Sequence, residues 1–263
     1  MNPAVVQSLP ESLTVELDDE VAVLRLSRPR KRNALDDATV LGIEEFFARP
    51  PEGVRAVVLD AEGDHFCAGL DLSELGDRDV VAAMEHSRMW HRAFARLAEG
   101  RLPVVSVLKG AVVGGGLELA SATHLRVAED STFYALPEGQ HGLFVGGGGS
   151  VRVPRLVGVH RMTDMMLTGR VLDADEGHAL GLSHYRAGPG EGLARACELA
   201  RTVAGNSAIT NVAVLQALPR IAEASPDHGF MMESLVAAVA SSSAEAQERM
   251  RAFLDGRGGK VRR

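Results

Sequence analysis

Short runs of β-forming residues alternate with helix-like segments before about residue 190, and this alternation constrains the fold more than any other feature of the sequence. The predicted strands cover residues 14–17, 21–26, 54–59, 104–108, 125–128 and 132–135. Most are continuous apolar runs, which are typical of strands covered on both faces. Helical patterns at 38–47 and 80–98 lie between them, and in the longer one Trp90, Phe94 and Leu97 share a face. The alternation predicts an α/β domain.

The strand signal ends near residue 190, and helical patterns follow it. We expect helices at 193–204 and 230–240, and a third that starts with a capping box of Ser242 and Glu245. The chain is therefore expected to divide into an α/β core at residues 1–190 and a helical lobe at 191–263. Near the N-terminus, an acidic turn at 18–20 separates two alternating strands and predicts a hairpin.

Charge and composition exclude several classes of function. The 263 residues carry a formal net charge of −7, which argues against a nucleic-acid partner because such binding requires a basic surface. No apolar run reaches the roughly 18 residues of a membrane span, and the N-terminus lacks a basic and apolar leader. Cys67 and Cys197 are far apart, which fits a reducing compartment. We expect a cytoplasmic protein with no membrane partner and, because the histidines lack ligand spacing, no metal.

The stretch GAVVGGGLELA at 110–120 places a carboxylate among apolar residues. Its three glycines follow a predicted strand and open a helix that begins near Leu117. Amides at such a start have no partner within the helix, although close packing of strand and helix alone can also require glycine. Glu118 is either a surface acid favoured by the helix dipole or a desolvated carboxyl group with a raised pKa, suited to acid or base catalysis.

A second acid, Glu138, follows the predicted strand at 132–135. Alone it is typical of a turn, but two acids on neighbouring strand ends would form a carboxylate pair. The segment 64–71 also follows a strand, and it is either an ordinary turn or a loop that directs backbone amides at a ligand. The glycines at 146–149 match neither a phosphate loop nor a serine-hydrolase motif, so we expect them to turn the backbone.

Three segments in this order resemble the crotonase or enoyl-CoA hydratase/isomerase family. They are HFCAGLDL at 65–72, GAVVGGGLELA at 110–120 and ALPEGQHGLFVGGGGSVRVPRLVG at 135–158. The resemblance covers nearly the whole chain. It implies a crotonase-like spiral of ββα units with a helical C-terminal lobe that assembles subunits and covers the active site, packed as a homotrimer or a dimer of trimers. It also implies an acyl-CoA thioester substrate of fatty acid metabolism and no cofactor, since coenzyme A is part of the substrate.

Matched to the family's motifs, four residues take catalytic roles. The backbone N–H groups of Ala68 and Gly115 would form an oxyanion hole for the thioester oxygen, and Glu118 and Glu138 occupy the two acid/base positions. Such a set suits hydration of a 2,3-double bond, because charge develops on the carbonyl oxygen while water loses a proton. The implied function is that of an enoyl-CoA hydratase, a hydro-lyase that adds water reversibly.

The resemblance also implies substrate-binding positions. These are Lys31, Arg32, Cys67, Ala68, Leu70, Gly114, Gly115, His141 and Gly142. Lys31 and Arg32, together with Arg28, lie in a segment that the family places near the nucleotide end of coenzyme A. Residues 72–90 are expected to shape the acyl site, although no single residue there stands out. The chain departs from the family at Gly139 and Val145. His141 is also unexpected; we hypothesise that it lines an acyl pocket of polar character, the alternative being a loop residue that faces solvent.

Three other activities remain open. A Δ3,Δ2-enoyl-CoA isomerase would move a proton with one carboxylate and no water, and an acyl-CoA hydrolase would release free thiol. A non-catalytic acyl-CoA-binding subunit would bind thioesters without turnover. The presence of both Glu118 and Glu138 favours hydration.

Overall fold

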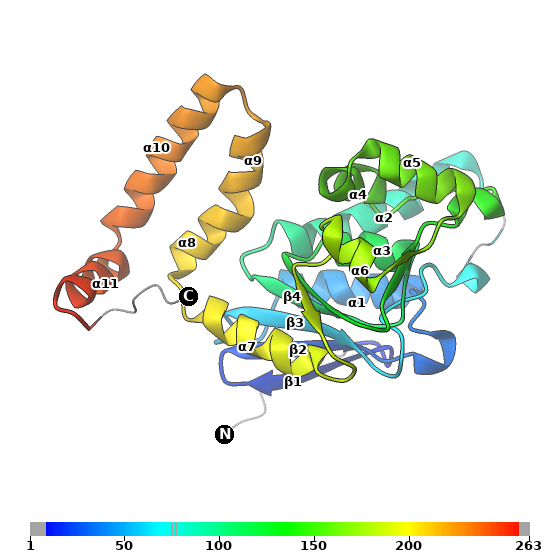
Figure 1. The fold of residues 1–263 in the computed structure, drawn as a ribbon, viewed down its shortest axis with the longest axis horizontal. Helices are drawn as coiled ribbons and strands as arrows, with labels where there is room; N and C mark the ends of the chain where they lie inside the picture. Colours follow the sequence, from blue (N-terminus) through cyan, green and yellow to red (C-terminus); the bar gives the residue numbers. More distant parts are fainter. Residues whose placement is uncertain (1–8, 75, 77, 258–263) are drawn as a thin grey trace.

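A computed structural model of the chain describes residues 9–74, 76 and 78–257. Two β-sheets and their covering helices form the body of the molecule, and the last helices project from it as an arm (Figure 1). The expected α/β class with a helical C-terminal part is confirmed.

The larger sheet contains six strands in the order β1-β2-β3-β4-β6-β9. The strands are β1 (Leu13–Asp18), β2 (Val21–Leu26), β3 (Ala56–Ala61), β4 (Val104–Leu108), β6 (Leu125–Glu129) and β9 (Tyr185–Ala187). β1 and β2 form the predicted antiparallel hairpin, with Leu13 opposite Leu26, and the other pairs in this sheet are parallel. β3 is buried along its whole length, as expected for a strand covered on both faces.

The smaller sheet contains β5 (Ala111–Val113), β7 (Phe133–Ala135) and β8 (Leu172–Asp173). β4 leads into β5 and then helix α3 (Gly115–Ser121), and β6 leads into β7 before the chain continues to helix α4 (Gly149–Val157). Successive units thus give one strand to each sheet before a helix, which is the expected ββα arrangement. β5 was not predicted, because three residues directly after β4 carry too little pattern to read as a separate strand.

Two helices cover one side of the larger sheet. They are α1 (Asp37–Ala48) and α2 (Val80–Ala98). Asp79 caps α2 by accepting a hydrogen bond from the Ala82 amide. Trp90, Phe94 and Leu97 are buried on the predicted face of α2 and join the main hydrophobic core. This packing places α2 beside the loops that follow β3 and β5.

The opposite face of the sheet is covered by α7 (Gly192–Ala204). Its Ala196, Ala200 and Ala204 recur every fourth residue and pack with strand valines in a second core. We expected this helix to belong to the C-terminal lobe; its alanine stripe instead joins it to the sheet. The segment that projects from the body begins after it (Figure 1).

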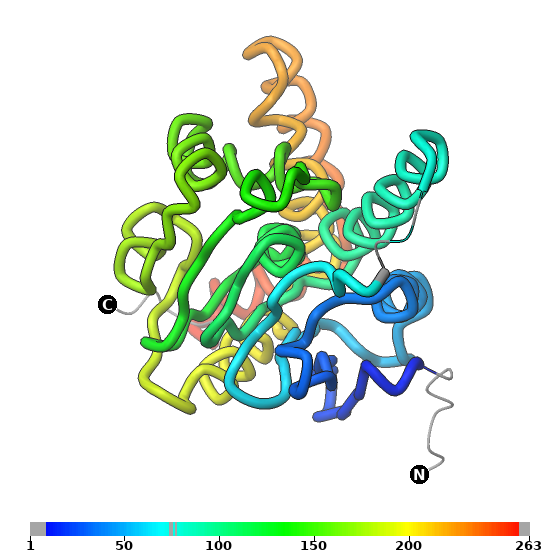
Figure 2. Tube along the Cα trace, turned by 90° about the vertical axis from the view of Figure 1, so that its right-hand side faces the viewer, coloured from blue at the N-terminus to red at the C-terminus, as the bar shows by residue number. Residues whose placement is uncertain are grey.

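The further helical segments are η1 (Pro29–Lys31), η2 (Leu72–Glu74), η3 (Glu138–His141), α5 (Val159–Thr168), α6 (Ala174–Ala179), α8 (Ala208–Val212), η4 (Ala213–Ala217), α9 (Leu218–Glu223), α10 (Pro226–Ser242) and α11 (Ala244–Leu254). The orange α10 extends beyond the body in both views (Figures 1 and 2). The predicted capping box is wrong by one residue: Ser242 ends α10, and Ser243 caps α11 by accepting from the Ala246 amide. Among the described helices, none is long and apolar enough to cross a membrane.

Candidate active site

A cavity of about 750 Å³ opens where α2, α3, η3 and the loops after β2 and β3 meet. Glu118 and Glu138, which are 20 positions apart in the sequence, both line it. Trp90 of α2 also lines it. A β-carbon on Gly115 would lie 2.8 Å from the Trp90 ring, and one on Gly147 2.9 Å from the same ring. Glycine is therefore required at both positions for this close packing.

Glu118 lies in the first turn of α3 and is only 3% exposed. Its Oε1 atom accepts hydrogen bonds from the Gly147 and Gly149 amides, each at 2.8 Å. Burial raises the pKa of Glu118, and the amides of this glycine loop oppose that effect. The surface-acid alternative is thus wrong: the carboxyl group is buried and satisfied by backbone donors.

Glu138 begins η3, directly after β7 and the Leu136–Pro137 link. Its Oε2 atom is buried, and no hydrogen-bond partner for it lies in the described part of the chain. Burial is the main cause that raises the pKa of Glu138 to about 7, and the charge of Glu118 adds to it. Glu138 and Glu118 are thus two buried carboxyl groups that line one cavity, and the charge of Glu118 favours the protonated form of Glu138.

The Ala68 amide does not face this cavity as an oxyanion donor would. The Cys67 carbonyl accepts from the Val113 amide, and the Ala68 N–H on the same peptide points the opposite way and donates to the Arg32 carbonyl at 3.0 Å. The expected role of Ala68 is therefore corrected, because its only N–H is already used. Ala68 was assigned this role from its place in the motif, but a motif does not show in which direction each peptide N–H points.

The Leu70 amide has the geometry expected of Ala68. The Gly69 carbonyl accepts from the Leu35 amide at 2.8 Å, so the Leu70 N–H on the same peptide points away from Leu35. Within the described residues, neither this N–H nor that of Gly115 has an acceptor. A β-carbon on Gly115 would lie 3.3 Å from the Leu70 nitrogen, so the two free amides lie side by side on the cavity wall.

Other residues that we expected to bind substrate divide into two groups. Lys31, Ala68, Leu70, Gly114, Gly115 and His141 line the cavity. Cys67, Arg32 and Gly142 are not among its lining residues. Cys67 is fully buried, which raises the pKa of its thiol to about 12, and Arg32 has an exposed side chain on a residue with φ of 50°.

Lys31, which lines the cavity, and Arg28 both pair with one carboxylate. Lys31 Nζ lies 2.7 Å from Asp71 Oδ2, and Arg28 Nη2 lies 2.8 Å from the same atom. The Lys31 ammonium is the main cause that holds the pKa of Asp71 far below its usual range. Arg28 also pairs with Asp36, so its charge is shared between two acids.

Four lining residues were not singled out as site residues. His86 and Ser87 of α2 lie in the segment 72–90 that we expected to shape the acyl site, and the loop residues Leu143 and Phe144 lie outside it. The helical periodicity of α2 marked Trp90 as core, but it could not show that Trp90 and the preceding turn also line a cavity. Phe144 is 71% exposed although it lines the cavity, an exposure that no sequence pattern indicates.

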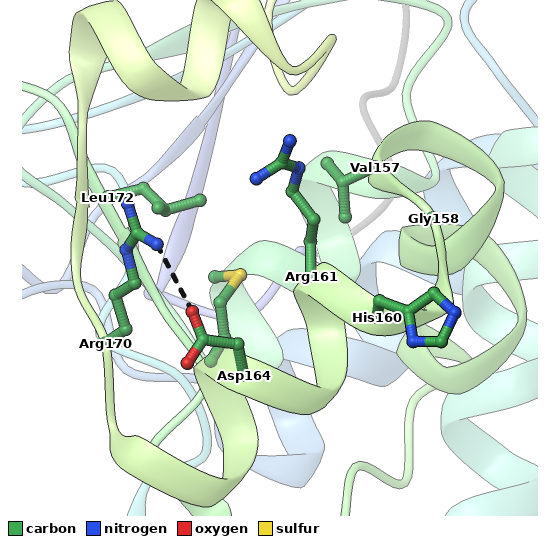
Figure 3. A pocket seen from close by; sticks show the side chains of 8 residues that line it. Val157, Gly158, His160, Arg161, Asp164, Arg170 and Leu172 are labelled. Atoms are coloured by element: carbon green, nitrogen blue, oxygen red, sulfur yellow. Dashed lines mark hydrogen bonds and ion pairs between the residues drawn. The ribbon is translucent and has the colours of Figure 1, made fainter.

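A second cavity, of about 480 Å³, is lined by residues of α5 together with Arg170 and Leu172 (Figure 3). Arg170 pairs there with Asp164 at 3.3 Å and with Glu176 at 2.7 Å. Neither Glu118 nor Glu138 lines this cavity. In the part of the chain that the structure describes, no cluster of three or more His, Cys, Asp or Glu side chains is arranged to hold a metal ion.

The fold and the paired acids define a class of protein, and the comparisons agree with it. The model of the enoyl-CoA hydratase/isomerase family matches residues 16–260, so the chain belongs to this family. A solved structure from Rhodopseudomonas palustris CGA009, a candidate enoyl-CoA hydratase, is 55% identical with a TM-score of 0.91, covering 93% of this chain and 95% of that one. The enoyl-CoA hydratase structure from Bacillus anthracis is 26% identical with a TM-score of 0.88, covering 95% and 98%.

Relatives known by name differ in length. The short-chain-enoyl-CoA hydratase of Clostridium acetobutylicum is 27% identical over 94% of this chain and 95% of its own. The α subunit of the fatty acid oxidation complex of Shewanella loihica is 43% identical over 63% of this chain, and the match spans 24% of that subunit. The 174 matched residues thus correspond to about a quarter of that larger protein.

Proposed function

We propose that the protein is an enoyl-CoA hydratase that adds water reversibly across the 2,3-double bond of an enoyl-CoA thioester. The observation that carries this proposal is the pairing of Glu118 and Glu138 in one cavity that also presents the free amides of Leu70 and Gly115. Family membership and relatives named as hydratases support it.

The two amides bind the thioester oxygen in this proposal. As water attacks C3, the electrons of the double bond move toward the carbonyl and charge grows on its oxygen. The N–H groups of Leu70 and Gly115 donate to that oxygen, and each donor of this kind stabilises a transition state by about 3 to 4 kcal/mol. Leu70 thus takes the role that the sequence assigned to Ala68.

The carboxyl pair moves the protons. Glu118, whose ionised form is favoured by the amides on Oε1, removes a proton from water as its oxygen bonds to C3. Glu138, whose pKa near 7 lets it hold a proton, delivers one to C2. Each transfer contributes roughly 10²- to 10⁴-fold to the rate. The net change is one water added, and the pair with the two amides is a sufficient set without a cofactor beyond the coenzyme A of the substrate.

At the cavity mouth, Lys31 is placed to bind coenzyme A. Its ammonium group is half-exposed beside Asp71, and a phosphate or pantetheine oxygen can accept from it without breaking that pair. Arg32 remains a proposed surface contact with the nucleotide, since its side chain is exposed. Salt is expected to weaken both contacts.

The C-terminal arm supports the proposed assembly as a homotrimer or a dimer of trimers in the cytoplasm. Its α10 exposes Phe230, Met231, Leu235 and Val239 by more than half. An apolar helix face of this kind is typical of a surface buried against another subunit. Light scattering on the purified protein tests this proposal, with a mass of three or six chains as the expected result.

Four assays on one panel of thioesters test the proposed activity. Hydration removes the conjugated absorbance of a 2-enoyl thioester, whereas isomerase activity creates it from a 3-enoyl thioester. Hydrolase activity releases free thiol, and a binding subunit shows affinity without turnover. We expect rapid loss of conjugated absorbance; free thiol without loss of conjugation would contradict the proposal.

A further inference from the structure

The carboxylate of Glu118 is held by a loop that is distant in sequence from its own helix. Its Oε1 atom accepts from Gly147 and Gly149, which lie 29 and 31 positions further along the chain. Gly147 precedes α4 and is itself outside any helix or strand. The orientation of Glu118 therefore depends on what fixes this glycine loop.

One support comes from α2. Ser87 Oγ donates to the Gly146 carbonyl at 2.7 Å. That carbonyl and the Gly147 N–H belong to one peptide group, so Ser87 and Glu118 hold the two ends of the same planar unit. A chain of hydrogen bonds runs from Ser87 through this peptide to Glu118, and such chains strengthen their members mutually.

A second support comes from α4. Arg152 Nη1 donates to the Gly147 carbonyl at 3.1 Å, which fixes the next peptide of the loop. The guanidinium group passes so close that a β-carbon on Gly148, whose φ is 97°, would lie 2.4 Å from Nη1. The left-handed backbone favours glycine at 148, and a larger residue there would also displace the end of the Arg152 side chain.

The charges around Glu118 come from three elements. Arg152 on α4 and Glu138 on η3 both interact electrostatically with it. His91 on α2 faces Arg152 and lies 3.4 Å from Ser87 Oγ. The Ser87 hydroxyl group donates its hydrogen to the Gly146 carbonyl. In its contact with His91 it can therefore only accept, from Nε2 of the histidine when that nitrogen carries a proton.

We propose that Ser87 and Arg152 are positioning residues that hold the Gly146–Gly147 segment, so that its amide keeps the Glu118 carboxylate in place for proton transfer. This inference rests on the proposed function for its kinetic consequence. Its structural content, the control of Glu118 by two side chains from other helices, does not depend on turnover.

Infrared titration of protein carrying ¹³C-labelled glutamate carboxyl groups tests the structural content, with the Glu118 band assigned by its loss in Glu118→Gln. Ser87→Ala removes the hydrogen bond that orients the Gly147 N–H toward Glu118, and Arg152→Gln removes a nearby positive charge. Both losses make the ionised form of Glu118 less favourable, so each variant is expected to raise the pKa of Glu118. Ser87→Thr keeps the hydroxyl group and is expected to restore the wild-type titration. Arg155→Gln is the matched control, since Arg155 on the same helix pairs with Glu223 instead.

Kinetics on the same variants test the consequence. Loss of a residue that orients a metal ligand typically changes activity by roughly 10- to 100-fold. We expect the lower end of that range for a residue that orients Glu118 through one peptide, so kcat falls about tenfold in Ser87→Ala while KM changes little. An unshifted Glu118 band in both Ser87→Ala and Arg152→Gln would overturn the proposal, as would equal shifts in Arg155→Gln or a Ser87→Thr variant that behaves like Ser87→Ala. A shifted band in a protein that hydrates no thioester would contradict the proposed function alone.

Discussion

The Leu70 amide nitrogen would lie 3.3 Å from a β-carbon on Gly115, and both residues present N–H groups without acceptors among the described residues. Two chain segments, the loop after β3 and the start of α3, meet closely enough there only because residue 115 lacks a side chain. The relationship makes Gly115 the most sensitive position of the proposed oxyanion hole.

Gly115→Ala is therefore expected to block the site. The added methyl group would occupy the space beside the Leu70 amide and press on the Trp90 ring, 2.8 Å away. Loss of an oxyanion donor lowers kcat by about 10²- to 10³-fold, and steady-state hydration kinetics measure it. Gly205→Ala is the control, since its β-carbon would meet neighbours only at 3.4 Å or beyond; equal activity of the two variants would contradict the account.

The raised pKa of Glu138 predicts a pH dependence of stability. Its pKa is about 7 in the folded chain against 4.5 for a free side chain, so the folded state binds the extra proton between these values. Its stabilising contribution is complete below about pH 4.5 and is lost as pH rises through 7. Urea unfolding at a series of pH values measures this, and Glu138→Gln is expected to flatten the decline. An unchanged slope in that variant would show that Glu138 titrates normally.

The same proton predicts a pH dependence of hydration. If Glu138 delivers a proton to C2, kcat/KM falls as pH rises above about 7, where the free enzyme loses that proton. A profile of kcat/KM against pH with a 2-enoyl thioester measures this fall at high pH. A profile that stays flat from pH 6 to 9 would remove Glu138 from the role of acid.

Cys67 is expected to resist thiol reagents. Its side chain is fully buried and its thiol pKa is about 12, so almost no reactive thiolate forms near neutral pH. Cys197 is partly exposed and is expected to be the thiol that labels in the folded protein, with Cys67 labelling after unfolding. Mass spectrometry after alkylation distinguishes the two. Fast labelling of Cys67 in the native protein would contradict its place in the core.

His141 is expected to influence substrate choice. It lines the cavity from η3 while its side chain remains exposed. Its position is therefore compatible both with a residue of the acyl pocket and with a loop residue that faces solvent. His141→Ala is expected to change the ratio of kcat/KM between straight-chain enoyl thioesters and hydroxylated or aromatic ones. The same ratio in wild type and variant would mean that the histidine only faces solvent.

Much of the fold could be predicted from local pattern. The β1–β2 hairpin, the apolar strands and the buried face of α2 follow from periodicity of two or of about 3.6 residues. The role of α7 could not be predicted, because an alanine stripe fits either a sheet face or another helix. β5 was missed because its three residues gain their identity only from pairing with β7.

The acids of the site could be predicted from sequence motifs, but one of the backbone donors and the supporting contacts could not. Glu118 stands out in the sequence because it lies among apolar residues. Glu138 alone is typical of a turn, and the family's motif identified it as the second acid. The exchange of Ala68 for Leu70 could not be foreseen. Two amides that lie two residues apart point the same way in an extended strand, but Gly69 between them has a φ of 100°. The hydrogen bonds to Arg32 and Leu35 then fix which amide faces the cavity. Ser87 could not be singled out within the segment 72–90, because its proposed role depends on a contact with a loop 59 positions away.

The most direct measurement is the rate of hydration of a 2-enoyl thioester by Glu118→Gln and Glu138→Gln, each checked for unchanged folding by circular dichroism. Glu85→Gln, an exposed acid on α2, is the control. The account predicts that each cavity variant loses roughly 10²- to 10⁴-fold in kcat while the control keeps wild-type activity. Hydration within a few fold of wild type in either cavity variant would contradict the claim that the two carboxyl groups move the protons.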